Sequence, residues 1–182
     1  MKRLYLVRNG RTEEGAGFDA NPRLDDVGRE QAEAVAKQLG PLPRMPILSS
    51  PQRRALETAE PLARRWQTSP VVDEAVSLMP LPSPETCDRK AWLMAFMKNR
   101  WRDAPDEQAG WREECLARIA SLQYDTAIFS HYLVINMIVG AALRDDRATV
   151  FQPDNGAITI LEVADGNLSL IERGRQAATW LL

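Results

Sequence analysis

The stretch Leu6-Val7-Arg8-Asn9-Gly10-Arg11-Thr12 follows a short apolar run at the start of the chain. Residues 3–8 predict a buried strand with a charged tip, and the glycines and proline of residues 9–24 predict a loop after it. Arg8 and Asn9 therefore lie at the carboxyl end of a strand. In open α/β sheets, ligands bind beyond that end of the strands, so the stretch predicts a polar site there.

Apolar runs and helical patterns alternate along the rest of the chain. Helices are expected from Asp25 or Asp26 to Gly40, from an N-cap at Ser50 with a kink at Pro61, in two segments of residues 87–122 split near Ala104-Pro105, and over residues 132–143. Strands are expected at residues 45–49, 70–76 and 126–129, and in a hairpin of residues 157–163 and 168–172. This order predicts one α/β domain over residues 1–182, a three-layer sandwich with a mainly parallel sheet and helices on both faces.

The composition excludes several classes of protein. The 182 residues carry a net charge of −2, which is unlike the basic excess of a nucleic-acid binder, and no stretch is apolar and long enough for a membrane span. Cys87 and Cys115 lack metal-binding spacing, and His131 is the only histidine, so no metal site is expected. Without a signal peptide, a cytoplasmic protein is expected. Nothing in the sequence indicates the oligomeric state.

Three predicted strand ends carry polar side chains. Arg8-Asn9, Ser49-Ser50 and Ser130-His131 come to one rim of the sheet, and Arg54 follows in the first turns of the next helix. Guanidinium groups bind two phosphate oxygens at once, and helix N-termini favour anions. Arg8, Arg54 and His131 therefore predict a site for a phosphate ion or a phosphorylated small molecule.

Four segments resemble the motifs of the histidine phosphatase superfamily, the phosphoglycerate-mutase-like fold. Residues 7–12 resemble its opening motif, residues 49–59 are very similar to its second motif, Ser130-His131 matches its second histidine, and residues 153–159 resemble the loop that follows. The resemblance implies a phosphomonoester hydrolase that needs no cofactor. It implies a histidine at position 9 that attacks phosphorus and becomes phosphohistidine, phosphoryl oxygens held by Arg8, Arg54 and His131, and an acidic residue that protonates the leaving group.

The chain departs from this pattern in three places. Asn9 stands where the family keeps its nucleophilic histidine, and an amide nitrogen is neither basic nor nucleophilic. Residues 77–81, where the family's glutamate is expected, hold no acid, and Glu85 is the candidate substitute. Tyr132-Leu133 replaces the two glycines that many members have after the second histidine.

Asn9 leaves several interpretations open. The chain is an impaired phosphatase, a non-catalytic protein that binds phosphorylated ligands, or an engineered substrate trap of an active enzyme. Direct attack by His131 is a further alternative. Thr12 and Asn155 are expected on the same rim as additional phosphate contacts, and residues 85–112 are expected to form a helical lid whose apolar stripe also packs on the core.

Overall fold

One mixed sheet forms the centre of the molecule in the computed structural model, which describes residues 1–13 and 21–178. Within these residues the sheet has six strands, in the order β3-β2-β4-β1-β5-β6. They are β1 (Lys2–Arg8), β2 (Ile47–Ser49), β3 (Val71–Val72), β4 (Thr126–Ser130), β5 (Ile158–Ala164) and β6 (Asn167–Glu172). The pairs β2–β3, β2–β4 and β1–β4 are parallel, whereas β1–β5 and β5–β6 are antiparallel.

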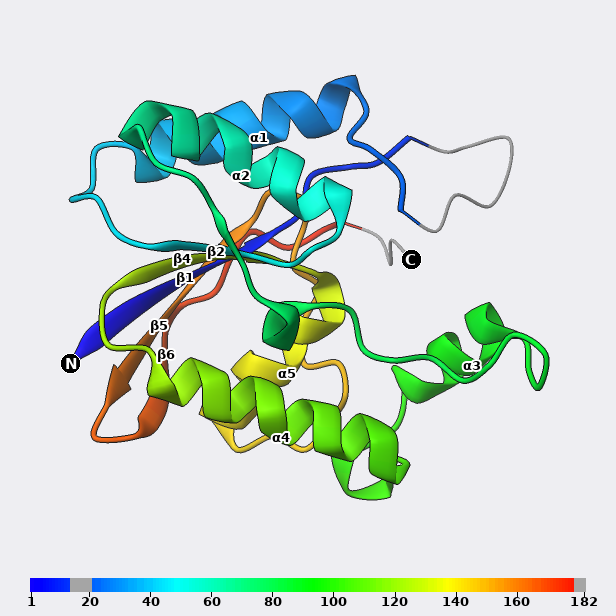
Figure 1. Cartoon of the computed structure of the whole chain (residues 1–182). Coiled ribbons are helices and arrows are strands. Elements are labelled where there is room, and N and C mark those ends of the chain that lie inside the picture. Colours follow the sequence, from blue (N-terminus) through cyan, green and yellow to red (C-terminus); the bar gives the residue numbers. More distant parts are fainter. Residues whose placement is uncertain (14–20, 179–182) are drawn as a thin grey trace.

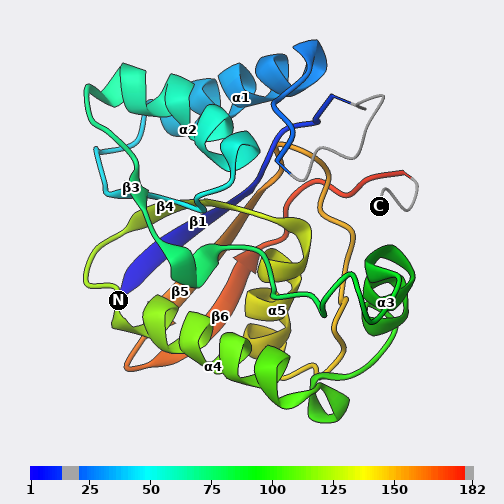
Figure 2. The ribbon, with the colours of Figure 1, turned by 45° about the vertical axis from the view of Figure 1, so that its right-hand side comes forward.

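Helices cover both faces of this sheet (Figures 1 and 2). One face carries α1 (Asp26–Leu39) and α2 (Arg53–Trp66), which lie side by side. The opposite face carries α4 (Asp106–Ser121) and α5 (Tyr132–Leu143), and α3 (Arg89–Phe96) extends outward beyond it. Two short 3-10 helices, η1 (Glu74–Val76) and η2 (Trp101–Asp103), join these elements. The three-layer α/β architecture is confirmed.

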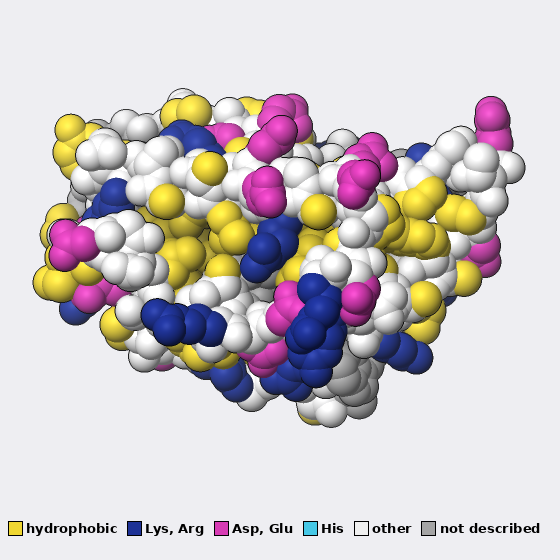
Figure 3. Space-filling view, turned by 90° about the horizontal axis from the view of Figure 1, so that it is seen from below, with side chains coloured by type: hydrophobic (Ala, Val, Ile, Leu, Met, Phe, Trp, Pro, Cys, Tyr) yellow, Lys and Arg dark blue, Asp and Glu magenta, His cyan; other side chains and the backbone are white. Residues whose placement is uncertain are grey.

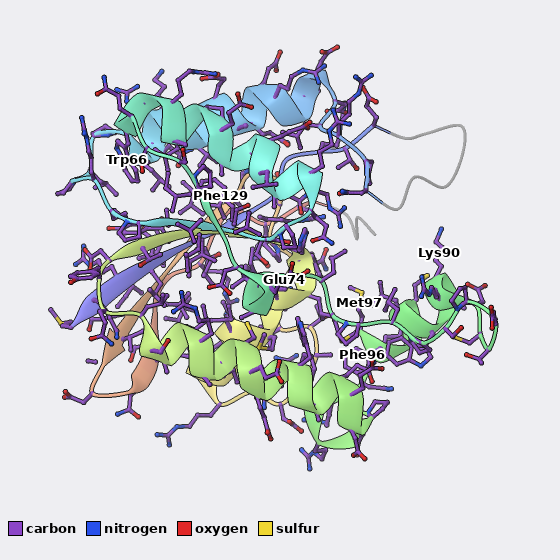
Figure 4. All side chains as sticks on the ribbon, in the orientation of Figure 1. Trp66, Glu74, Lys90, Phe96, Met97 and Phe129 are labelled. Carbon is purple, nitrogen blue, oxygen red and sulfur yellow. The ribbon has the colours of Figure 1, made fainter. Side chains whose placement is uncertain are left out.

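The period of two along the strands explains the two cores. Leu4 and Leu6 of β1 belong to the cluster under α4 and α5, whereas Tyr5 and Val7 belong to the cluster under α1 and α2. Phe129 of β4 also joins the second cluster, together with Trp66 of α2, and both are labelled in Figure 4. Apolar side chains on both faces of β1 and β4 are typical of strands that are covered on both sides.

Several predicted elements are confirmed. Asp25 is the N-cap of α1, and its carboxylate accepts a hydrogen bond from Gly28 N at 2.6 Å. The hairpin of β5 and β6 turns at Asp165-Gly166, both at positive φ. The predicted break near Ala104-Pro105 separates η2 from α4. The loop predicted over residues 9–24 includes residues 14–20, which lie outside the described residues. In the described part of this loop, Thr12 and Leu24 form an isolated antiparallel β-bridge.

Two local predictions are wrong. The strand expected at residues 70–76 is limited to Val71–Val72, because the Asp73 carboxylate accepts a hydrogen bond from Ala75 N and starts η1. Ser50 is not the N-cap of α2, which begins at Arg53 with Gln52 as its cap residue. The Ser50 hydroxyl contacts His131 instead.

Candidate active site

Three parallel strands end at one rim of the sheet and place three residues beside one another. Asn9 N donates to Ser130 O at 2.9 Å, and Ser50 N donates to Phe129 O at 2.9 Å, so the chain ends of β1 and β2 both flank that of β4. α5 begins directly after His131. Positions 9, 50 and 131 are thereby neighbours at the carboxyl ends of β1, β2 and β4.

The side chains of these residues form a continuous hydrogen-bonded line. Ser50 Oγ lies 2.7 Å from His131 Nε2, and His131 Nδ1 lies 3.1 Å from Asn9 Oδ1. The residues are nearly inaccessible to solvent, with exposed fractions of 0% for Ser50, 4% for His131 and 7% for Asn9. Both ring nitrogens of His131 are therefore occupied by side chains of this cluster.

The partners of Asn9 fix the protonation of the His131 ring. Asn9 Nδ2 donates to Gly10 O at 2.9 Å, which leaves Asn9 Oδ1 as an acceptor for His131 Nδ1. Nδ1 must then carry the ring proton. In a neutral imidazole the other nitrogen is an acceptor, so His131 Nε2 and Gln52 Oε1, which lies 2.9 Å from Ser50 Oγ, share the single proton of the Ser50 hydroxyl.

His131 is held in the neutral form. Burial, together with the positive charges of Arg54 and Arg8, lowers its pKa from 6.5 to about 3. This effect of both guanidinium groups on the ring indicates that they lie near the imidazole. Arg8 of β1, Arg54 of α2 and His131 at the end of β4 thus converge, as an anion site requires.

The two arginines differ in how they are held. Arg8 Nη1 donates to Pro153 O at 2.7 Å, and its guanidinium lies over the Tyr132 ring at 5.1 Å from the centroid. Among the described residues, the Arg54 guanidinium has no hydrogen bond or ion pair. Burial lowers the pKa of both arginines. Partly buried guanidinium charge without a carboxylate partner favours an anionic ligand.

Backbone contacts fix position 9 from two sides. Thr58 Oγ1 of α2 accepts from Gly10 N at 2.9 Å and donates to Arg54 O at 2.6 Å. Asn155 Nδ2 donates to Asn9 O at 2.9 Å, and Asn155 is 8% exposed. Asn155 therefore contacts the cluster through the backbone of Asn9.

The remaining predicted site residues lie further out. Thr12 is half-buried and pairs with Leu24, and Glu85 is exposed in the turn before α3. Within the described ranges, no hydrogen bond or ion pair joins either side chain to the cluster of Asn9, Ser50 and His131. Glu74, labelled in Figure 4, is exposed on η1.

Three residues contribute to the site without a predicted role in it, although Ser50 is expected on the same rim. These are Ser50, Gln52 and Thr58. Gln52 Oε1 lies 2.9 Å from Ser50 Oγ and 3.3 Å from Ser77 Oγ, so the segment after η1 also meets the rim. Strand-end position was a signal for Ser50, but its residue type favoured helix capping.

Across residues 1–13 and 21–178, no group of three or more His, Cys, Asp or Glu is placed to hold a metal ion. Two hollows, of about 610 Å³ between α1 and α2 and about 460 Å³ beside Tyr5 and Tyr124, include none of the cluster residues. The face in Figure 3 mixes charges of both signs with apolar side chains, unlike the basic surface of a nucleic-acid binder. No helix in the described part of the chain is long and apolar enough to cross a membrane.

Comparison with known proteins identifies relatives over nearly the whole chain. The family model of the histidine phosphatase superfamily (branch 1) matches residues 4–175. A glucosyl-3-phosphoglycerate phosphatase of Mycobacterium tuberculosis is 29% identical over 174 residues, covering 90% of this chain and 74% of that protein. One of Mycolicibacterium vanbaalenii is 44% identical over 69 residues, covering 36% of this chain and 31% of that protein.

Solved structures share the fold. A mycobacterial glucosyl-3-phosphoglycerate phosphatase in complex with inorganic phosphate superposes with a TM-score of 0.73 at 23% identity, covering 97% of this chain and 98% of that one. A structure described as mycobacterial hydrolase 2 gives a TM-score of 0.76 at 22% identity, covering 98% and 92%.

Proposed function

The chain belongs to the histidine phosphatase superfamily, and we propose that it binds phosphomonoesters or phosphate at the rim of Arg8, Arg54 and His131 but is severely impaired in phosphohistidine-dependent hydrolysis. The observation that carries this proposal is the state of Asn9. Its amide nitrogen donates to Gly10 O, and its oxygen accepts from His131, so the side chain presents no nucleophile.

The anion-binding part of the site supports the ligand class. The Arg54 guanidinium is unpaired within the described residues, and Arg8 keeps donors beyond the one that contacts Pro153 O. Bidentate guanidinium contacts and the start of α5 favour a phosphoryl group. The relative in complex with inorganic phosphate and the mycobacterial glucosyl-3-phosphoglycerate phosphatases support a phosphorylated small molecule as the ligand class.

The proposal also covers a histidine at position 9. A histidine whose Nδ1–H replaces the Asn9 amide as donor to Gly10 O would extend its Nε2 beyond the amide, toward the arginines. That nitrogen would be free to attack phosphorus and carry the phosphoryl group. In the same proposal, residues 85–112 are the lid, and its stacked Trp92–Phe96 pair, with ring centroids 5.2 Å apart, stiffens α3.

The experiment compares turnover of p-nitrophenyl phosphate by this protein and by Asn9→His, without added metal. We expect the histidine variant to be at least about 10²-fold faster, because it regains covalent catalysis. Isothermal titration with inorganic phosphate should give binding in roughly the micromolar to millimolar range for both proteins.

The outcomes separate the alternatives. Equal, fast turnover by both proteins would refute the assignment of Asn9 as the cause of impairment. An inert Asn9→His variant that still binds phosphate would favour the purely non-catalytic binding protein. Glu85 is the proposed leaving-group acid, so Glu85→Gln in the Asn9→His background should slow turnover of alkyl phosphates more than that of p-nitrophenyl phosphate.

A further inference from the structure

The line of Ser50, His131 and Asn9 has the order of a catalytic triad. A hydroxyl lies 2.7 Å from one nitrogen of an imidazole, and the other nitrogen lies 3.1 Å from a side-chain oxygen that orients the ring. In serine and cysteine hydrolases, a nucleophile, a histidine base and an Asp or Asn have these roles. Asn9, which stands in place of the family's nucleophilic histidine, thus supplies the side chain that orients the base of a second catalytic group.

We propose that Ser50 is a second nucleophile of this site, with His131 as its general base and Asn9 as the residue that positions the base. The substrate class is a phosphomonoester with a stable leaving group, such as an aryl phosphate. This inference rests on the proposed phosphate site, because Arg8 and Arg54 would hold the phosphoryl oxygens next to Ser50.

The reaction balances without a further reactant besides water. Ser50 Oγ forms a bond to phosphorus while the bond from phosphorus to the leaving oxygen breaks. His131 Nε2 takes the Ser50 proton, and the aryl oxygen, which lies in line on the opposite side of phosphorus, leaves as the phenolate anion. Water then attacks the phosphoserine from that opposite side, the protonated His131 Nε2 returns its proton to Ser50 Oγ as the bond from phosphorus to Oγ breaks, and H2PO4− leaves.

The state of His131 fits the role of a base. Its Nδ1–H is engaged by Asn9 Oδ1, so the lone pair at Nε2 faces the Ser50 hydroxyl. In the ligand-free chain its pKa is lowered to about 3 by burial and by Arg54 and Arg8. A phosphate dianion between the two guanidiniums offsets their charge, so ligand binding raises the basicity of the ring.

Access to Ser50 requires a local movement. Ser50 is fully buried, and the half-buried Gln52 side chain contacts its hydroxyl at 2.9 Å. Gln52 is also joined to Ser77 at 3.3 Å. A phosphoryl group has to displace the Gln52 amide before the Ser50 hydroxyl becomes accessible. We therefore expect turnover through Ser50 to be slow.

The test is a phosphoenzyme assay on the full chain. The protein is mixed with p-nitrophenyl phosphate, quenched, and analysed for the covalent phosphoryl group by peptide mass spectrometry after acid and after alkali treatment. Phosphoserine survives acid and is lost in alkali, whereas phosphohistidine shows the opposite behaviour. We expect acid-stable phosphate on Ser50, which Ser50→Ala abolishes.

Ser49→Ala is the matched control. Ser49 is equally buried, but its hydroxyl donates to Ser50 O at 2.9 Å and does not contact His131. This variant should retain the phosphoenzyme. Thermal unfolding and phosphate titration of both variants test whether they are folded and bind ligand. If Ser50→Ala does not fold, the site of modification in the unsubstituted protein still decides the question.

Each result separates this inference from the proposed function. Acid-stable phosphate on Ser50 supports the inference. Phosphate binding without any phosphoenzyme overturns it and leaves the proposed phosphate site intact. Acid-labile phosphate on His131 also overturns it, because the base is then the nucleophile. Absence of both binding and phosphoenzyme overturns the inference and the proposed function together.

Discussion

The hydroxyl of Thr58 joins α2 to the backbone of Gly10, which donates its N–H to Thr58 Oγ1 at 2.9 Å. The same hydroxyl donates to Arg54 O at 2.6 Å. One fully buried side chain therefore links the residue after Asn9 to the helical turn that carries Arg54. This contact joins the chain next to Asn9, at one end of the hydrogen-bonded line, to Arg54, which lies outside that line.

Replacement of Thr58 by valine should reduce both stability and phosphate affinity. The Gly10 N–H would lose its acceptor in a buried position, which costs about 1–3 kcal/mol of the free energy of unfolding. Urea unfolding measures this loss, and phosphate titration measures the accompanying rise in Kd. Thr68 is exposed and provides the control. Thr68→Val should change the free energy of unfolding by no more than about 0.5 kcal/mol. Equal effects of the two substitutions would contradict the role of Thr58.

Two glycines should respond to alanine in opposite directions. A Cβ at Gly28 would collide with the Arg11 backbone oxygen, where α1 packs closely against the loop after β1. Gly28→Ala should therefore destabilise the protein by about 1–3 kcal/mol or more. Gly110 in α4 has nothing within 4 Å of an added Cβ, so Gly110→Ala should stabilise it by about 0.5–1 kcal/mol. Denaturant midpoints of the two variants test this, and destabilisation by both would refute the packing argument.

Arg54→Ala should weaken phosphate binding by at least about tenfold, because a charge-assisted contact worth about 1.5–3 kcal/mol is lost. The neighbouring Arg53 is exposed and forms an ion pair with Glu57 at 2.7 Å. Arg53→Ala, titrated with phosphate under the same conditions, should leave Kd nearly unchanged. If the two variants bind equally well, Arg54 does not hold the anion.

Arg54→Ala should also raise the pKa of His131, because it removes one of the charges that lower it. His131 is the only histidine of the chain, so its ring signals in an NMR titration are unambiguous. In the unsubstituted protein the ring should remain neutral from pH 8 to about pH 4, given its pKa of about 3. A His131 pKa near 6.5 in the unsubstituted, ligand-free protein would contradict the burial of the ring beside Arg54 and Arg8.

Stability should fall as the pH drops below 6.5. The unfolded chain protonates His131 near pH 6.5, whereas the folded chain resists protonation until about pH 3, so the unfolded state binds the additional proton in this window. The slope is at most about 1.4 kcal/mol per pH unit. Unfolding free energies measured between pH 7 and pH 4.5 should show a steeper decline for this protein than for His131→Asn. An equal dependence of the unfolding free energy on pH in the two proteins would refute the link between His131 protonation and stability.

Much of the fold could be predicted from local patterns. The apolar runs of β1 and β4 and the helical spacing of α1 and α2 identify buried elements, because burial on one or both faces requires that spacing. β3 was predicted too long because a single carboxylate, Asp73, ends the strand and starts η1. Such a local side-chain contact competes with strand pairing and leaves little trace in the apolar pattern.

The positions of the site residues could be predicted in part. Arg8, Asn9 and His131 were expected on one rim because strand ends in a parallel sheet meet there, and the structure brings them together. Ser50 was assigned to helix capping because a serine before proline is typical of a helix start. Its actual partner lies 81 residues away, so no local pattern could reveal it.

The sequence by itself determined the α/β architecture, the family and the amide at position 9, since each depends on residue type and local spacing. Only the tertiary structure decided how that amide is used. Asn9 and His131 are 122 residues apart, and their contact exists because β1 and β4 pair in a register that sets Arg8 opposite Ser130. Register and the burial it creates are long-range properties, and they fix the proton on His131 Nδ1 and the approach of Ser50 to Nε2.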